Sequence, residues 1–84
     1  MDNKTNIYEI DVAEKTFNDV TNYNFYITDN RDIKNGDYIL FRVVVKDEKG
    51  KTSYTGANAM LTVNNVNDTF TGLANNHVVV FLKK

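Results

Sequence analysis

Four side chains in the first half of the chain have the chemistry that nucleic-acid binding requires. Lysine and arginine neutralise phosphates, and arginine also presents a planar fork of donors to a phosphate or a base. A tyrosine ring can stack on an unpaired base, a contact worth about 1–3 kcal/mol. The candidate contacts with nucleic acid are Arg31, Lys34, Tyr26 and Arg42.

The two arginines also have structural interpretations. Arg31 can brace its own polar loop by pairing with Asp29, Asp32 or backbone carbonyls, and this interpretation is the favoured one. Arg42 stands inside an apolar stretch, so it either binds an anion or packs its stem while the guanidinium reaches solvent.

The tyrosine is assigned by strand periodicity. Apolar residues at every second position place Tyr23 and Phe25 on one face of a strand and Tyr26 on the other. We therefore expect Tyr23 and Phe25 in the core, and Tyr26 at the surface as the residue able to stack on a base.

Composition excludes several kinds of site. The chain has no cysteine, so a thiolate nucleophile or thiolate metal site is impossible, and one histidine cannot make a histidine-rich site. Asp29, Asp32 and Asp37 lack the spacing and terminal glutamate of a calcium-binding EF-hand. We expect neither metal nor cofactor.

Charge gives no global attraction to nucleic acid, because the net charge is −1. Residues 1–37 carry −4 and residues 38–84 carry +3, which permits a local basic patch. No stretch approaches the roughly 20 apolar residues of a membrane span, and the N-terminus lacks a secretory pattern. We expect a cytoplasmic protein without membrane contact.

The first half of the chain predicts strand, helix and strand. Residues 8–12 alternate as a half-buried strand does, and Ala13, Phe17 and Val20 then recur at helical spacing. Asp11 and Glu14 resemble a capping box for that helix. A second strand over 23–27 follows, and Asn35-Gly36 predicts a tight turn.

The second half predicts further strands. Residues 38–45 are almost wholly apolar, which is typical of a central strand shielded on both faces. A hairpin turn at 47–50 precedes a strand or strand pair over 52–54 and 57–63, interrupted by a bulge or bend at Gly56. A polar connection containing Phe70 and Leu73 leads to the last strand, 77–82.

These elements predict one domain over 1–84, of the α+β class and mainly β. Five or six strands in so short a chain are best protected by curling into a small barrel, because open edges invite aggregation. The single helix near the N-terminus is expected to lie against that sheet.

The order of short motifs resembles an uncharacterised bacterial and phage branch of the ASCH superfamily (activating signal cointegrator homology), whose domains are PUA-like β-barrels. The matching pieces span about residues 8–83. They are Tyr8-Glu9-Ile10, Asn30-Arg31-Asp32, Gly36-Asp37, Tyr54-Thr55-Gly56, Gly72-Leu73 and Val78-Val79-Val80. The resemblance implies an RNA-binding domain with its site in a cleft beside the first helix.

The chain departs from the signature of that superfamily. Relatives carry Gly-x-Lys near the helix end and then a strand with Glu-x-Arg. Here Tyr26 and Thr28 stand in place of the glutamate and arginine, and Asn22-Tyr23-Asn24 contains no Gly-x-Lys. Some relatives are amidohydrolases that use lysine, threonine and glutamate, so these departures argue against an enzyme.

The sequence therefore predicts a module that binds structured or single-stranded RNA. The main alternative is an ASCH scaffold reused for protein–protein contact, with a homodimer as one form of it. A small hydrolase with a rearranged site is a third and more distant hypothesis.

Overall fold

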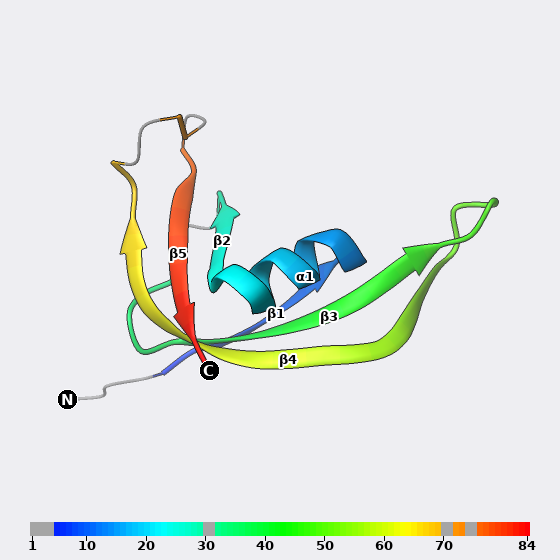
Figure 1. Ribbon diagram of the computed structural model, residues 1–84, viewed down its shortest axis with the longest axis horizontal. Helices are drawn as coiled ribbons and strands as arrows, with labels where there is room; N and C mark the ends of the chain where they lie inside the picture. Colours follow the sequence, from blue (N-terminus) through cyan, green and yellow to red (C-terminus); the bar gives the residue numbers. More distant parts are fainter. Residues whose placement is uncertain (1–4, 30–31, 70–71, 74–75) are drawn as a thin grey trace.

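A computed structural model of the protein describes residues 5–29, 32–69, 72–73 and 76–84. Within them the fold consists of β1 (Ile7–Val12), α1 (Glu14–Tyr23), β2 (Phe25–Thr28), β3 (Tyr38–Lys46), β4 (Thr52–Asn67) and β5 (Val78–Lys83). The five strands form one sheet in the order β1-β3-β4-β5-β2, with β1 parallel to β3 and the other pairs antiparallel (Figure 1). The predicted small, mainly β fold with one early helix is confirmed.

The helix α1 starts immediately after β1 and ends at a left-handed residue. Its Val20 is buried and Phe17 packs against the same core. The predicted capping box is wrong: Ala13 is the N-cap and makes no side-chain cap, because Asp11 still belongs to β1. Asn24 has a φ of 59°, and its N–H donates to the Val20 carbonyl at 2.9 Å, which closes the last turn.

The sheet has two arms: β1 and β3 pair with the first part of β4 in one arm, and β5 and β2 with its last part in the other. Strand β3 is central in the first arm, between β1 and β4. Its burial alternates: Ile39, Phe41 and Val43 are buried, whereas Leu40 and Arg42 on the opposite face are only half-buried. The prediction of shielding on both faces is wrong: α1 covers only the face that bears Ile39 and Phe41, and the other face stays partly exposed.

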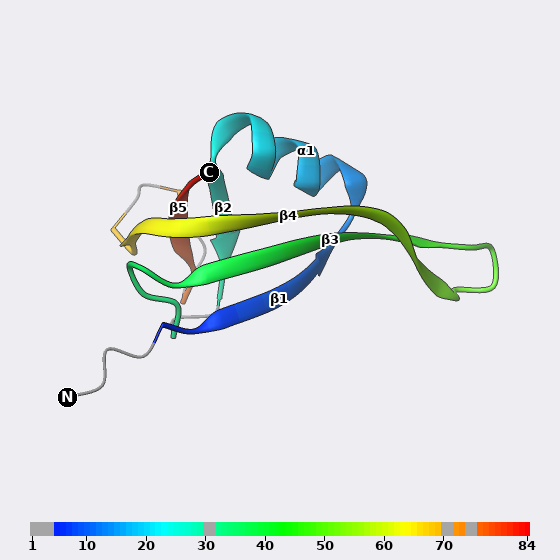
Figure 2. The same cartoon turned by 90° about the horizontal axis from the view of Figure 1, so that it is seen from below.

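Strand β4 is a single strand of 16 residues, which is one of the two alternatives that the sequence left open. Its pairing with β3 is irregular between Arg42 and Val44, and Gly56 in the opposing segment has a φ of 95°, so the predicted bulge is confirmed. The strand pairs first with β3 and then with β5, and the sheet bends along it with α1 on the inner side of the bend (Figures 1 and 2).

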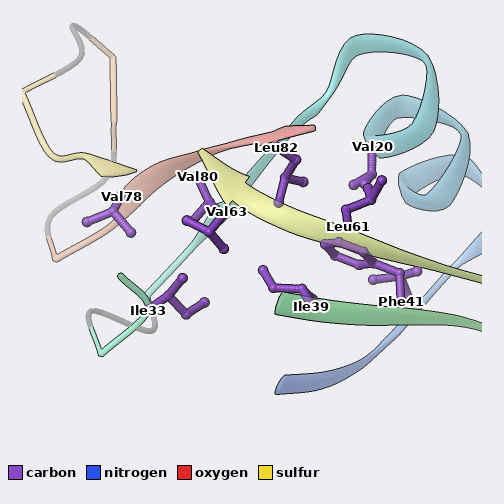
Figure 3. Packing of buried hydrophobic residues seen from close by; sticks show 10 residues of the cluster. Val20, Ile33, Ile39, Phe41, Leu61, Val63, Val78, Val80 and Leu82 are labelled. Carbon is purple, nitrogen blue, oxygen red and sulfur yellow. The ribbon is translucent and has the colours of Figure 1, made fainter. Parts of the chain in front are cut away.

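The hydrophobic core fills the inner side of this bend (Figure 3). Phe41 and Ile39 have no exposed surface, and burial of each such side chain contributes about 1.5–3 kcal/mol. Both arms of the sheet and the helix supply the core, which comprises Val12, Val20, Ile33, Ile39, Phe41, Leu61, Val63, Val78, Val80 and Leu82.

The closed barrel predicted from the sequence is not confirmed. Closure requires β1 to pair with β2, but these strands are the two edges of the sheet in the described residues. The helix that connects them contacts β3 and β2, and so lies between the two arms of the bent sheet. The sheet is therefore curved but open.

One buried carboxylate ties the start of β1 to the turn before β3. Asp37 is 4% exposed, and its two oxygens accept the N–H groups of Asn6 at 3.1 Å and Lys34 at 2.9 Å. The main chain of Asp37 also bonds Val63 in β4, whose N–H donates to its carbonyl at 2.7 Å. Gly36, with a φ of 89°, makes the tight turn that the sequence predicts.

Candidate functional site

A groove of about 180 Å³ lies between α1 and the edge strand β2. Its lining includes Tyr26, which points to the core side of β2, and Phe25 and Ile27, which point to the other side. A space that touches both faces of a strand must lie along its edge, and β5 occupies the other edge. The groove therefore follows the unpaired edge of β2. Its helical wall is formed by Thr16, Asp19 and Val20.

A second hollow, of about 210 Å³, lies on the face of β2 and β5 that is turned away from the core. It is lined by Phe25, Ile27, Val79 and Phe81. The register pairs Phe25 with Phe81 and Ile27 with Val79, so these side chains form two adjacent cross-strand pairs. Phe25 and Ile27 line both spaces, which makes β2 the shared wall of a continuous apolar surface.

Among the described residues that line the two hollows, the one charged side chain is acidic, that of Asp19 in the groove. The pKa of Tyr26 is raised above its ordinary value, first by burial of the phenol and then by the charge of Asp29. Asp29 is therefore a second negative charge that acts on β2.

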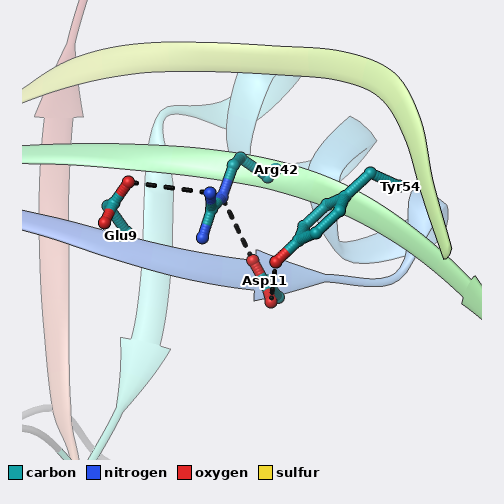
Figure 4. A network of polar contacts seen from close by, with 4 residues as sticks. All are labelled: Glu9, Asp11, Arg42 and Tyr54. Carbon is teal, nitrogen blue, oxygen red and sulfur yellow. Dashed lines mark hydrogen bonds and ion pairs between the residues drawn. The ribbon is translucent and has the colours of Figure 1, made fainter. Parts of the chain in front are cut away.

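Arg42 belongs to a separate cluster on β1, β3 and β4, on the face of these strands that is turned away from the core (Figure 4). Its guanidinium lies 3.3 Å from Asp11 and 3.6 Å from Glu9. The Nε–H is not aligned for a hydrogen bond to Asp11, so that contact is an ion pair. Tyr54 covers the guanidinium at 4.9 Å from the ring centroid and donates its O–H to Asp11 at 3.0 Å. These contacts account for the charge of Arg42, with one carboxylate in excess.

The phenol of Tyr54 in this cluster has a pKa above its ordinary value. The hydrogen bond to Asp11 is the main cause of this raised pKa, followed by loss of solvent; the charge of Arg42 lowers the pKa, and the charges of Asp11 and Glu9 raise it. Asp11 stabilises the protonated phenol because that form donates to its carboxylate. Tyr54 is therefore held as a donor and links the start of β4 to β1.

The described candidates for RNA contact do not converge. Tyr26 packs edge-on against Phe41 with ring centroids 5.1 Å apart, so the prediction that it faces away from the core is wrong. Arg42 points from the other face of β3, and Lys34 is an exposed residue of the turn before β3. The fourth candidate, Arg31, lies outside the described residues.

Sequence reasoning missed the residues that line the groove. Thr16 and Asp19 are three positions apart, a spacing that puts both on one face of a helix, and this signal was present in the sequence. Phe25 was assigned to the core because alternation was counted from Tyr23. Tyr23 is instead the last helical residue, and Asn24 turns the chain before β2 begins.

The described part of the chain contains no group of three or more histidine, aspartate or glutamate side chains that could hold a metal ion. None of its helices has the length and hydrophobicity needed to cross a membrane.

Comparison with known proteins gives no name to this arrangement. The chain matches no protein-family model and no curated protein.

Proposed function

We propose that this chain is a small, non-catalytic binding module of the ASCH and PUA-like kind that contacts a second copy of itself. The contact surface, here called the outer face, is the side of β1, β3 and β4 away from α1. Its kinship to the superfamily is part of the proposal and is supported by the motif order and by the curved sheet that encloses an early helix. A full barrel would need β1 to pair with β2.

The observation that carries the proposal is the exposure of large apolar side chains on this face. Ile7 is 61% exposed, Met60 49% and Tyr38 39%. The register places Ile7 beside Tyr38, and Leu40 between Glu9 and Met60, so the apolar residues form neighbouring cross-strand rows. A contiguous exposed apolar patch of this kind is typical of a protein contact.

The charges on the outer face suit a two-fold contact. Arg42 and its two acidic partners, Glu9 and Asp11, lie at one end of the apolar rows. A symmetric contact uses the same patch on both copies. Because Arg42 is already paired with Glu9 and Asp11, this cluster brings only one uncompensated negative charge per copy to the contact. The net charge of −1 creates little repulsion between copies.

The size of the molecule is sufficient for such a contact. A standard interface buries about 800 Å² on each partner, or roughly an eighth of the 6057 Å² surface. The sheet runs along a molecule whose principal extents are 45 × 32 × 21 Å, so one face provides this area. Two sheets can then pack face to face, as they do in sandwiches.

Sedimentation equilibrium from micromolar to millimolar protein tests the proposal. We expect concentration-dependent dimerisation of the natural chain and its loss in Met60→Lys. Val45→Lys is the matched control, because Val45 is 50% exposed against 49% for Met60 but lies near the hairpin tip. A monomer at every concentration, or equal loss in the two variants, contradicts the proposal.

A second candidate function is RNA binding. Its structural support is the position of the groove beside the first helix, where the resemblance to the ASCH superfamily places the ligand site. The ring of Phe25 at this groove offers a stacking surface for an unpaired base, whereas Asp19 in the lining opposes a phosphate there. We expect salt-dependent retention on an RNA column, reduced in an Arg31→Ala/Lys34→Ala double variant. Absence of retention at low salt excludes this candidate.

A further inference from the structure

We infer that the open edge of β2 takes up an extended peptide segment of a partner protein, which adds to the sheet as a sixth strand. The segment would carry apolar side chains at alternate positions and a lysine or arginine opposite Asp19. This site is separate from the outer face, and the inference does not depend on dimerisation.

The hydrogen-bond phase of β2 leaves main-chain groups directed at the groove. Leu82 N–H donates to the Asn24 carbonyl at 2.8 Å, and the register continues with Phe25 opposite Phe81. In an antiparallel ladder, hydrogen-bonded pairs alternate with pairs whose N–H and C=O groups point away from the partner strand. The main-chain groups of Phe25 and Ile27 therefore face the free edge.

The side chains of this edge do not block strand addition, although the strand is only four residues long and α1 flanks the groove beside it. Charged side chains, proline and bulges are three of the devices that blunt natural edge strands, besides short length and cover by a helix. The residues of β2, Phe25–Thr28, contain no charge and no proline, and their register with β5 is unbroken. By contrast, the other edge strand, β1, carries Glu9 and Asp11. The two edges are thus unequal, and β2 is the accessible one.

The space beside the edge fits a peptide backbone and its side chains. The groove of about 180 Å³ runs between the unpaired edge and α1, and the second hollow, of about 210 Å³, adjoins it. Ile27, which lines both, is 49% exposed. An added strand would direct alternate side chains over the face that bears Phe25, Ile27 and Phe81, because side chains alternate along a strand.

Charge complementarity defines the partner. Asp19 lines the groove on the helix side, and Asp29 follows β2 and acts on Tyr26. Because the described lining of the two hollows carries Asp19 and no basic residue, it disfavours a phosphate backbone and favours a basic peptide. Main-chain hydrogen bonds give such a contact its affinity, and the side-chain hollows and Asp19 give it specificity.

Fluorescence polarisation tests the inference with a labelled peptide of alternating valine and threonine flanked by lysines. We expect binding to the natural chain and no binding of the same peptide flanked by glutamates. N-methylation of alternate amides in the lysine peptide should abolish binding, because it removes the donors that face β2. Equal binding of the methylated peptide overturns strand addition.

Two variants separate the main-chain and charge contributions. Ile27→Pro removes a donor directed at the open edge while leaving the partners of β5 intact, so binding should weaken at least about tenfold. Asp19→Asn should weaken it about two- to fivefold, whereas Asp47→Asn in the distant hairpin should have no effect.

Perturbed amide resonances of Phe25, Tyr26 and Ile27 in the peptide complex would locate the bound peptide on β2. Unchanged resonances there, or binding of oligouridine at this edge in place of the peptide, overturn the inference. Self-association abolished by Ile27→Pro with no peptide binding also overturns it, since the occupant would then be a second copy.

Discussion

Asp37 and Asp47 each accept two main-chain N–H groups. Comparing them tests how burial changes the contribution of such hydrogen bonds to the free energy of unfolding. Asp37 binds Asn6 N–H at 3.1 Å and Lys34 N–H at 2.9 Å, and it is buried. Asp47 binds the N–H groups of Lys49 and Lys51, both at 2.9 Å, in an exposed hairpin. The number of main-chain donors is therefore matched. Burial differs, and so do the acceptors, because Asp37 uses both of its oxygens and reaches the distant Asn6, whereas Asp47 uses one oxygen for two local N–H groups.

We expect Asp37→Ala to lower the free energy of unfolding by about 2–3 kcal/mol. Each bond to a charged acceptor contributes about 1.5–3 kcal/mol, and partial access of water to the two donors reduces the loss to about half. A chain of 84 residues has a total stability of about 4–13 kcal/mol, so the loss is a large fraction of it. Asp47→Ala should cost less than half as much, because its donors can bond to water.

Urea denaturation followed by circular dichroism measures both losses. With a slope of about 1 kcal/mol per molar urea for so small a protein, Asp37→Ala should lower the midpoint by about 2 M at unchanged slope. The midpoint of Asp37→Asn should lie between those of the natural chain and Asp37→Ala, because the amide keeps one acceptor but places a donor against the second N–H. Equal midpoint shifts for Asp37→Ala and Asp47→Ala would refute the reasoning.

Two further predictions concern the core. Phe41→Ala should cost about 3–5 kcal/mol because it leaves a cavity beneath Tyr26 and α1, and Phe41→Leu should cost clearly less; equal losses in urea titrations would contradict the packing described. Tyr26 has a pKa raised above its ordinary value of 10.0, so the fold favours the neutral phenol. The stability that this shift contributes is complete below pH 10 and declines as the pH rises from there through the folded-state pKa. Tyr26→Phe should flatten that decline in urea midpoints measured from about pH 9 to about pH 11, whereas Tyr23→Phe should not; an unchanged decline in Tyr26→Phe would count against burial of the phenol.

The sequence predicted most elements because their signals are local. Two-residue alternation identifies β1, helical spacing of Phe17 and Val20 identifies α1, and Asn35-Gly36 identifies the turn. Gly56 correctly marks the bulge, because a positive φ is accessible to glycine without strain.

The failures arise where tertiary contacts decide. Asp11 was assigned to a helix cap, but its carboxylate binds Tyr54 and pairs with Arg42, both distant in sequence. Tyr26 was assigned to the surface because alternation was carried across Asn24, whose left-handed conformation resets which side chain points inward. The local sequence pattern indicates neither the contacts of Asp11 nor the orientation of Tyr26.

The candidate site was the least predictable part. The groove depends on how α1 lies beside β2, and that arrangement follows from the packing of Val20 in the core. Arg42 was chosen as an exposed cation, yet two carboxylates of β1 neutralise it once β1 and β3 pair in parallel. A charged side chain that looks free in a sequence can therefore be neutralised by residues that strand pairing places beside it.

The central claim is that the outer face of β1, β3 and β4 contacts a second copy of the chain. The most direct measurement is a dilution series of amide and side-chain NMR spectra. The account predicts concentration-dependent shifts at Ile7, Tyr38, Leu40 and Met60, with β2 and β5 unchanged. Spectra that do not change with concentration, or shifts confined to β2 and β5, would contradict it.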